Sequence, residues 1–201
     1  MSGEQPVFYY DLYSPYAYLA ALRVDELLPV EARWQPIVFG ALLRETGRTP
    51  WSLRAGDRED GQQEVQRRAH ERGVGEVRWP PGWPAESYSV LPLRAIVWAG
   101  REDAAAAKRL SMALYEIAFG QGRSLADLAT VREAVDECGL NAAELASGTE
   151  DREVKDALRA NTSDAIARGV TGIPTVAVGE LLYWGDDRLE EVAAALGERP
   201  A

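Results

Sequence analysis

Cysteine and histidine are nearly absent, since the 201 residues include one of each, Cys138 and His70. One cysteine cannot close a disulfide within the chain, so a disulfide framework is excluded. The two residues also lie far apart in the sequence and suggest neither a metal site nor a Cys–His catalytic pair, so we expect no metal. We predict that Cys138 packs at the end of a helix and that His70 is exposed.

Positive charge is also scarce. The chain has 22 lysines and arginines against 32 aspartates and glutamates, a net charge of -10 at pH 7. This balance argues against nucleic acid or an anionic membrane surface as the main partner. The chain has no run of about 18 apolar residues, the length that would span a membrane. Its first residues also lack the basic and apolar parts of a secretory signal. We therefore expect a cytoplasmic protein.

The chain does have enough apolar residues, 46% of the total, for one compact domain with a large insertion. Residues 7–11 and 32–39 have the short β-rich pattern of strands. Between them, Ser14 and Pro15 fit the N-cap and first position of a helix that we expect to run to Leu27. A strand, a helix and a strand in so short a span predict a parallel pair of strands.

The remaining sequence divides into a helical middle and a β-rich end. Residues 49–61 are predicted to be a loop, and Ser124 is predicted to be an N-cap. A hairpin is expected at 174–178 and 181–184, so the fold class is α/β. We predict that residues 1–39 and 169–201 complete one mixed sheet, β-α-β … β-β-α, and that 40–168 form a mostly helical insertion. Helical spacing predicts helices over 62–72, 93–99, 103–119, 125–137, 142–146, 151–167 and 188–196.

Three motifs stand out: Ser-Pro-Tyr-Ala at 14–17, Gly-Val-Thr-Gly-Ile-Pro-Thr at 169–175 and Trp-Gly-Asp-Asp-Arg-Leu at 184–189. Together they resemble the thioredoxin-like family that includes DsbA-type disulfide oxidoreductases, kappa-class glutathione transferases and 2-hydroxychromene-2-carboxylate isomerases. The isomerases are the most similar of these. The resemblance implies a thioredoxin-like sheet with a large helical insertion and, as in these relatives, a homodimer.

Ser14 is the candidate catalytic residue. Redox members of the family carry a CxxC motif where this chain has Ser14 and Ala17, so the resemblance implies that redox exchange is lost. It also implies that Ser14 faces the sulfur of bound glutathione. A hydroxyl and the amides at a helix start both stabilise a thiolate and lower the pKa of the thiol. The alternative is that Ser14 only caps the helix.

The resemblance assigns cofactor-binding residues at the other two motifs. Ile173-Pro174 is similar to the family's cis-proline loop, whose backbone pairs with the cysteinyl amide of a tripeptide; the alternative is a trans proline that begins a strand. Asp187 takes the position that binds the γ-glutamyl ammonium, and Asp186 adds a second carboxylate that would repel the ligand's own. Capping of the last helix is the alternative for both. Arg54 is our candidate for a ligand carboxylate, against solvated surface charge.

Tyr16, Trp83 and Tyr88 are expected to line an aromatic substrate pocket, with buried packing as the alternative. The leading hypothesis is a glutathione-dependent isomerase of the 2-hydroxychromene-2-carboxylate type, in which a bound thiolate adds reversibly to a conjugated aromatic acid. A kappa-like glutathione transferase acting on electrophiles is the second hypothesis. A non-catalytic thioredoxin-like binding module is the third. A fourth replaces glutathione with a similar small thiol, which the second carboxylate at Asp186 suggests.

Overall fold

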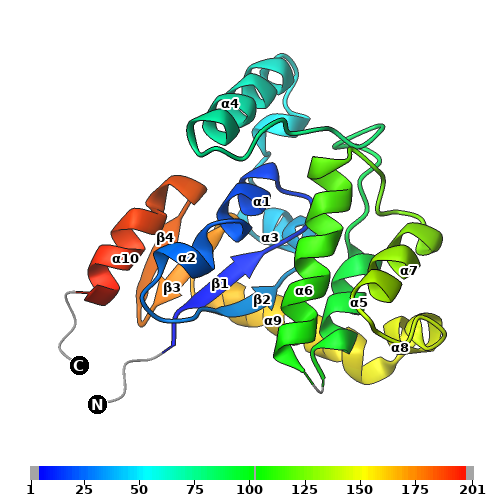
Figure 1. The fold of residues 1–201 in the computed structure, drawn as a ribbon. Coiled ribbons are helices and arrows are strands. Elements are labelled where there is room, and N and C mark those ends of the chain that lie inside the picture. The colour runs from blue at the N-terminus through cyan, green and yellow to red at the C-terminus, as the bar shows by residue number, and fades with distance from the viewer. Residues whose placement is uncertain (1–4, 102, 198–201) are drawn as a thin grey trace.

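A computed structural model describes residues 5–101 and 103–197 of the chain. These residues form one sheet whose strands are β1 (Val7–Tyr10), β2 (Arg33–Pro36), β3 (Thr175–Val178) and β4 (Leu181–Trp184). The strand order is β2-β1-β3-β4 (Figure 1). β1 pairs in parallel with β2 and antiparallel with β3, which forms a hairpin with β4. The predicted mixed sheet and hairpin are therefore confirmed.

The burial of each strand follows its place in this order. β1 and β3 lie in the middle and are buried at every position, as their apolar sequences require. β4 is an edge strand on which Leu181 and Trp184 remain exposed. β2 is the other edge strand and ends at Pro36, where a residue without an N–H is tolerated.

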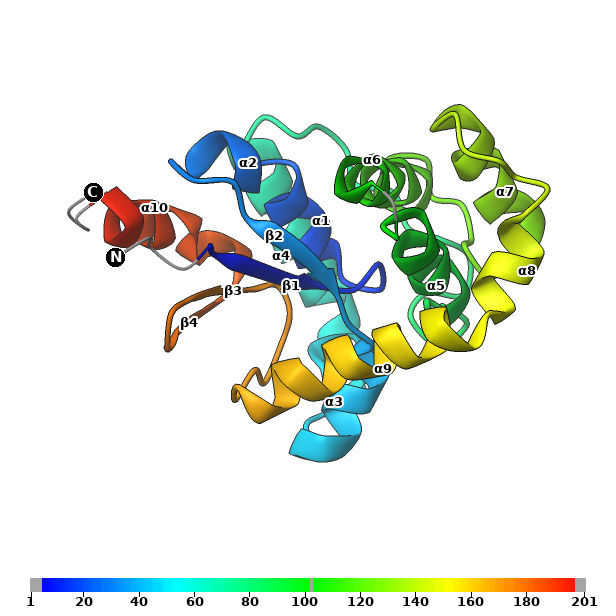
Figure 2. The same ribbon diagram turned by 90° about the horizontal axis from the view of Figure 1, so that it is seen from below.

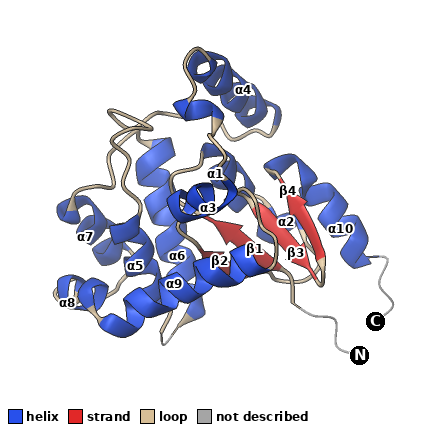
Figure 3. Ribbon diagram, turned by 180° about the vertical axis from the view of Figure 1, so that it is seen from behind, coloured by secondary structure: helices blue, strands red, loops and turns tan. Residues whose placement is uncertain are grey.

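Helices cover both faces of the sheet, which makes three layers (Figure 2). One face carries α1 (Pro15–Ala21), α2 (Val24–Leu27) and α10 (Leu189–Gly197). The other face, seen in Figure 3, carries α3 (Phe39–Thr46) and α9 (Arg152–Ala167). The core on this second face joins Tyr9 and Ala177 of the sheet to Leu42 and Ala165 of the two helices.

The remaining helices lie beside the sheet or above its end. They are α4 (Asp57–Glu71), α5 (Val90–Ala99), α6 (Ala104–Tyr115), α7 (Leu128–Glu137) and α8 (Leu145–Glu150). Helices from the segment 40–168 thus both cover the sheet and extend beside it, and the division into 1–39, 40–168 and 169–201 stays a prediction. Among the described residues, no helix combines the length and apolar character that crossing a bilayer needs.

Two predictions for the first third of the chain were wrong. The first helix does not continue to Leu27, because Arg23 leaves helical geometry at φ -124° and forms an ion pair with Glu190 of α10 instead. The predicted loop 49–61 contains a short 3₁₀ helix (Trp51–Leu53) and the first turn of α4. That turn begins at Asp57, and its acidic residues suit the positive end of the helix dipole.

The middle helices also start and end differently from the prediction. Ser124 does not cap α7; Asp127 does, by accepting a hydrogen bond from Ala129 N at 3.0 Å. The helix expected over 103–119 passes into a π-helical turn, Glu116–Gly120, after α6. The helix expected over 142–146 is displaced toward the C-terminus, as α8.

Asp11 joins the end of β1 to the elements around it. Its Oδ1 accepts a hydrogen bond from Tyr13 N at 3.0 Å, and its Oδ2 accepts one from Phe39 N at 2.7 Å. Its backbone oxygen accepts from Ser14 N and from the Tyr115 hydroxyl. Burial raises the pKa of the Asp11 carboxyl to about 6, although the two backbone N–H groups oppose the shift.

This raised pKa predicts a pH-dependent stability. The folded protein holds the Asp11 proton up to about pH 6 and the unfolded chain releases it near 3.8, so the free energy of unfolding falls as pH rises through that window. The loss is roughly 3 kcal/mol. Asp11→Asn removes this titration, so its stability relative to wild type should improve by about that amount between pH 4 and pH 7. Urea unfolding of both proteins across this pH range measures the difference in their free energies of unfolding. A difference that stays constant with pH would contradict the raised pKa of Asp11.

Candidate functional site

A cleft of about 410 Å³ opens at the end of β1 where α1 begins. This volume is in the range of small-molecule sites. All three sequence motifs contribute to it, although the last two lie more than 150 residues from the first. The walls are formed by residues 13–16, 48–52, 54, 171–174 and 184–187, together with Phe39, Leu43, Arg68 and Trp83.

Ser14 lies in this cleft at the N-cap of α1, as predicted. Its Oγ accepts a hydrogen bond from Ala17 N at 3.2 Å, and Pro15 occupies the first helical turn. The side chain is 6% exposed. Capping uses a lone pair of the oxygen and leaves the hydroxyl hydrogen available as a donor. The capping and ligand-facing interpretations are therefore compatible.

The Ile173–Pro174 peptide bond is cis, as the resemblance implied. Both residues line the cleft beside Ser14. The N–H and C=O of Ile173 form no hydrogen bond with any residue in 5–101 or 103–197. An extended backbone placed alongside could satisfy both groups, as in the addition of a strand.

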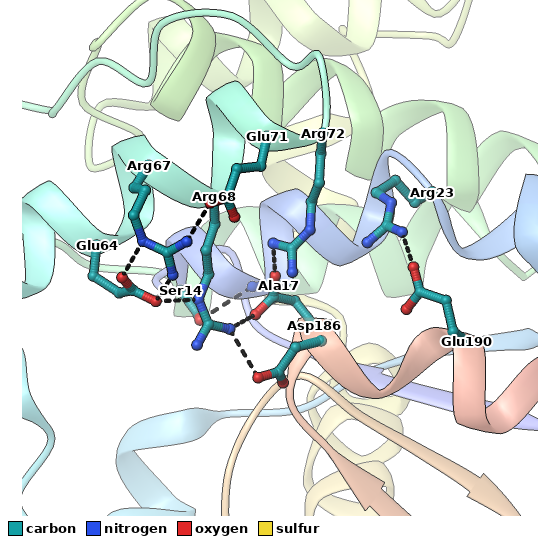
Figure 4. Close-up of polar contacts among 11 residues, drawn as sticks. Ser14, Ala17, Arg23, Glu64, Arg67, Arg68, Glu71, Arg72, Asp186 and Glu190 are labelled. Atoms are coloured by element: carbon teal, nitrogen blue, oxygen red, sulfur yellow. Dashed lines mark hydrogen bonds and ion pairs between the residues drawn. The ribbon is translucent and has the colours of Figure 1, made fainter.

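Asp186 is the first residue of a short 3₁₀ helix, η3 (Asp186–Arg188), and is 1% exposed. Its Oδ1 lies 2.7 Å from Arg68 Nη1, and its Oδ2 pairs with Arg72 Nη1 (Figure 4). Burial raises the pKa of Asp186, while Arg72 and Arg68 act in the opposite direction. The repulsion expected from this second carboxylate assumed an unpaired charge, and two guanidinium groups balance it instead.

Asp187 is different, because its side chain is 52% exposed and reaches the cleft. Its Oδ2 lies 3.2 Å from Arg68 Nη1. Gly185 precedes these acids with φ 125°, a conformation that L side chains rarely adopt, and a Cβ at this position would overlap Asp187 Oδ1. The glycine therefore leaves room for the Asp187 carboxylate.

Three arginines reach the cleft, and sequence reasoning chose one of them. Arg54 lines it, but its Nε lies 3.1 Å from Asp57 and more than half of its side chain is exposed. Arg48 stacks over the Trp184 ring at 4.4 Å and has no acidic partner among the described residues. Arg68 was missed because its contact with Asp186 spans 118 positions of sequence.

Aromatic side chains build one wall. Tyr16 and Trp83 line the cleft as expected, and Trp51 stands between them, with ring centroids 6.1 Å and 5.5 Å away. Trp83 is also packed against Trp79, so it both lines the cleft and is buried by packing. The prediction for Tyr88 was wrong: it is 56% exposed and lies outside the cleft lining, because the chain turns from Trp83 toward the start of α5.

The sequence matches the DsbA-like thioredoxin domain over residues 7–197. The chain belongs to this family. Within it, the chain is 25% identical over 205 residues to glutathione S-transferase kappa 2 of Caenorhabditis elegans, with 95% of this chain and 91% of that protein covered.

Solved structures share this DsbA-like fold. A 2-hydroxychromene-2-carboxylate isomerase superposes with a TM-score of 0.84 at 21% identity, covering 96% of this chain and 95% of the isomerase. The cytosolic disulfide reductase DsbM of Pseudomonas aeruginosa, solved with glutathione, superposes with a TM-score of 0.64 at 15% identity, covering 96% and 98%. At these identities the likeness establishes the fold.

This DsbA-like chain has no cysteine in its cleft. Cys138 lies at the C-cap of α7, is partly buried, and has a thiol pKa that burial raises. A single cysteine in that position cannot carry out exchange between paired thiols. No cluster of three or more His, Cys, Asp or Glu side chains suited to a metal occurs in the described part of the chain.

The conformation of Gly185 supplies a test of the cleft. Gly185→Ala should lower the free energy of unfolding by about 1–3 kcal/mol, because alanine is strained at this φ. Gly40→Ala is the matched control, since Gly40 lies in α3 with open space at its Cβ position and no unusual φ. Thermal unfolding compares the two. Equal effects would contradict a special conformation at Gly185.

Proposed function

We propose that the protein binds glutathione with its sulfur against Ser14 and isomerises a conjugated aromatic carboxylic acid, in the manner of 2-hydroxychromene-2-carboxylate isomerase. The observation that carries the proposal is that three groups line one cleft: the buried Ser14 hydroxyl, the Asp187 carboxylate, and Ile173 backbone groups that have no partner within the described part of the chain. These groups suit the thiol, the peptide backbone and the ammonium of one tripeptide. The glutathione named with DsbM supports the same ligand.

Ser14 performs the central step by donating its hydroxyl hydrogen to the sulfur. A donor held at a helix start favours the thiolate and lowers the thiol pKa. When bound, glutathione supplies the nucleophile that adds reversibly to an electron-poor carbon of the substrate. Ile173 orients the ligand through its backbone. Because Ser14 is already held by Ala17 N, little reorganisation is needed to present the hydroxyl.

The aromatic wall and the arginines suit the substrate. Tyr16, Trp51 and Trp83 offer flat apolar surface to a ring. Arg48 and Arg54 also line the cleft and provide cations for its carboxylate. An aromatic acid thus finds both a stacking surface and a counter-charge.

A kappa-like glutathione transferase is the second candidate, favoured by the identity to the Caenorhabditis elegans protein over nearly the whole chain. It would use the same thiol site and differ only in the second substrate. A non-catalytic binding module remains the alternative if no thiol binds. A thiol other than glutathione is less favoured now that Arg68 and Arg72 balance Asp186.

We extend the proposal to a cytoplasmic homodimer. The resemblance to dimeric relatives carries the oligomeric state, and the scarcity of cysteine is consistent with a reducing compartment. Light scattering should therefore give twice the mass of one chain. The mass of a single chain at micromolar concentration would contradict the dimer.

Ser14→Ala tests the thiol site. Wild type should bind glutathione with a dissociation constant between micromolar and millimolar, about -8 to -4 kcal/mol. The variant should lose activity by about two to three orders of magnitude, because a donor to the developing charge is removed. Calorimetric titration measures the binding, and the ultraviolet absorbance of the bound thiolate against pH measures the thiol pKa, which should rise in the variant. Turnover of an aromatic acid substrate measures the activity.

Asp127→Ala is the control. It removes an N-cap from α7, far from the cleft, at a similar cost of about 1 kcal/mol in stability. It should leave binding and the thiol pKa unchanged. If Ser14→Ala behaves like Asp127→Ala, then Ser14 is a cap and the proposed mechanism is wrong.

A further inference from the structure

We propose that Arg68 binds the carboxylate of an α-amino-acid head group whose ammonium binds Asp187, the residue to which the resemblance already assigns it. This inference rests on the proposed function, because the head group is that of the bound thiol, a γ-glutamyl group in glutathione. The resemblance implies that amides at the start of the last helix hold this carboxylate, and Arg68 of helix α4 adds a cation to them. It also gives the buried Asp186 the task of positioning Arg68.

The guanidinium of Arg68 is held in place with part of it unused. Its Nε donates to Glu64 at 2.6 Å and its Nη1 to Asp186 at 2.7 Å. The group lies over the Tyr16 ring at 5.1 Å and lines the cleft. No residue in 5–101 or 103–197 accepts a hydrogen bond from Nη2. One nitrogen of a fixed fork therefore remains to bind an anion.

Asp186 cannot itself bind the ligand's ammonium, because both of its oxygens are engaged. One faces Arg68 and the other faces Arg72, as Figure 4 shows, and the carboxylate is closed to solvent. Removing one partner of such a buried pair leaves an uncompensated charge, so Asp186 keeps Arg68 turned toward η3. Asp186 is thus a positioning residue.

Asp187 is the acid that remains open. Its Oδ2 lies 3.2 Å from Arg68 Nη1, and its Oδ1 has no partner among the described residues. A cation and an anion so close together match the carboxylate and ammonium that an amino acid carries on one carbon. Each currently serves as the other's partner, and a zwitterion can pair with both without changing the net charge of the cleft.

The experiment compares three tripeptides by calorimetry: glutathione, its analogue with 4-aminobutyrate in place of γ-glutamate, which lacks only the α-carboxylate, and its analogue with a glutaryl group, which lacks only the ammonium. Wild type should bind each analogue about 10- to 100-fold more weakly than glutathione. Arg68→Met should weaken glutathione by a similar factor and leave the affinity for the 4-aminobutyryl analogue unchanged. Asp187→Asn should weaken the binding of glutathione and leave only the affinity for the glutaryl analogue unchanged.

Arg72→Met is the matched control, because it also removes a partner of Asp186 but does not line the cleft. It should change the three affinities equally and by less than about threefold. Arg68→Lys, which keeps the charge without the fork, provides the measurement if Arg68→Met does not fold, and it should show the same selective loss to a smaller degree.

The outcomes separate the two proposals. If wild type binds glutathione and the 4-aminobutyryl analogue equally, or if Arg68→Met weakens both equally, the head-group site is wrong while the thiol site stands. If wild type binds none of the three tripeptides, the proposed function fails, and the head-group site fails with it.

Discussion

The buried carboxylate of Asp11 is the constraint on which the rest of the site depends. Its two oxygens accept the N–H groups of Tyr13 and Phe39, and its carbonyl accepts the N–H of Ser14. The end of β1, the N-cap of α1 and the start of α3 are thereby fixed to one residue. Because Ser14 is placed by that junction and not by a flexible loop, its hydroxyl is preorganised toward the cleft.

The two buried acids near the cleft are stabilised differently, and the difference matters for chemistry. Burial raises the pKa of both carboxyls, but Asp11 accepts hydrogen bonds from backbone N–H groups, which add no charge. Asp186 is compensated by Arg68 and Arg72, which bring two cations from α4 to η3. The first arrangement fixes geometry. The second also brings a cation to the cleft, because Arg68 lines it while holding Asp186.

Features coded by neighbouring residues could be predicted from the sequence. Ser14 and Pro15 predict a helix start, and the β-rich segments at 174–178 and 181–184 predict the hairpin. The structure has both features at these residues. Features that depend on distant packing could not be. Arg23, just after the end of the first helix, pairs with Glu190, and Arg68 pairs with Asp186 across 118 positions of sequence. The prediction for Tyr88 was wrong for a related reason, since closeness to Trp83 in the sequence does not place a residue at the same cleft.

The choice between isomerase and transferase depends on the substrate side of the cleft, since both would share the thiol site. A transferase acts on diverse electrophiles, many of them neutral, and gains little from fixed positive charge near the second substrate. Here Arg48 lies over Trp184 with no acidic partner among the described residues, and Trp51 and Trp83 give the same cleft an aromatic wall. A cation beside a flat apolar surface favours a planar anion, because the surface can stack on the ring while the cation binds the carboxylate. This combination is why we propose an aromatic acid as the substrate, and isomerisation as the reaction, ahead of transfer to a neutral electrophile.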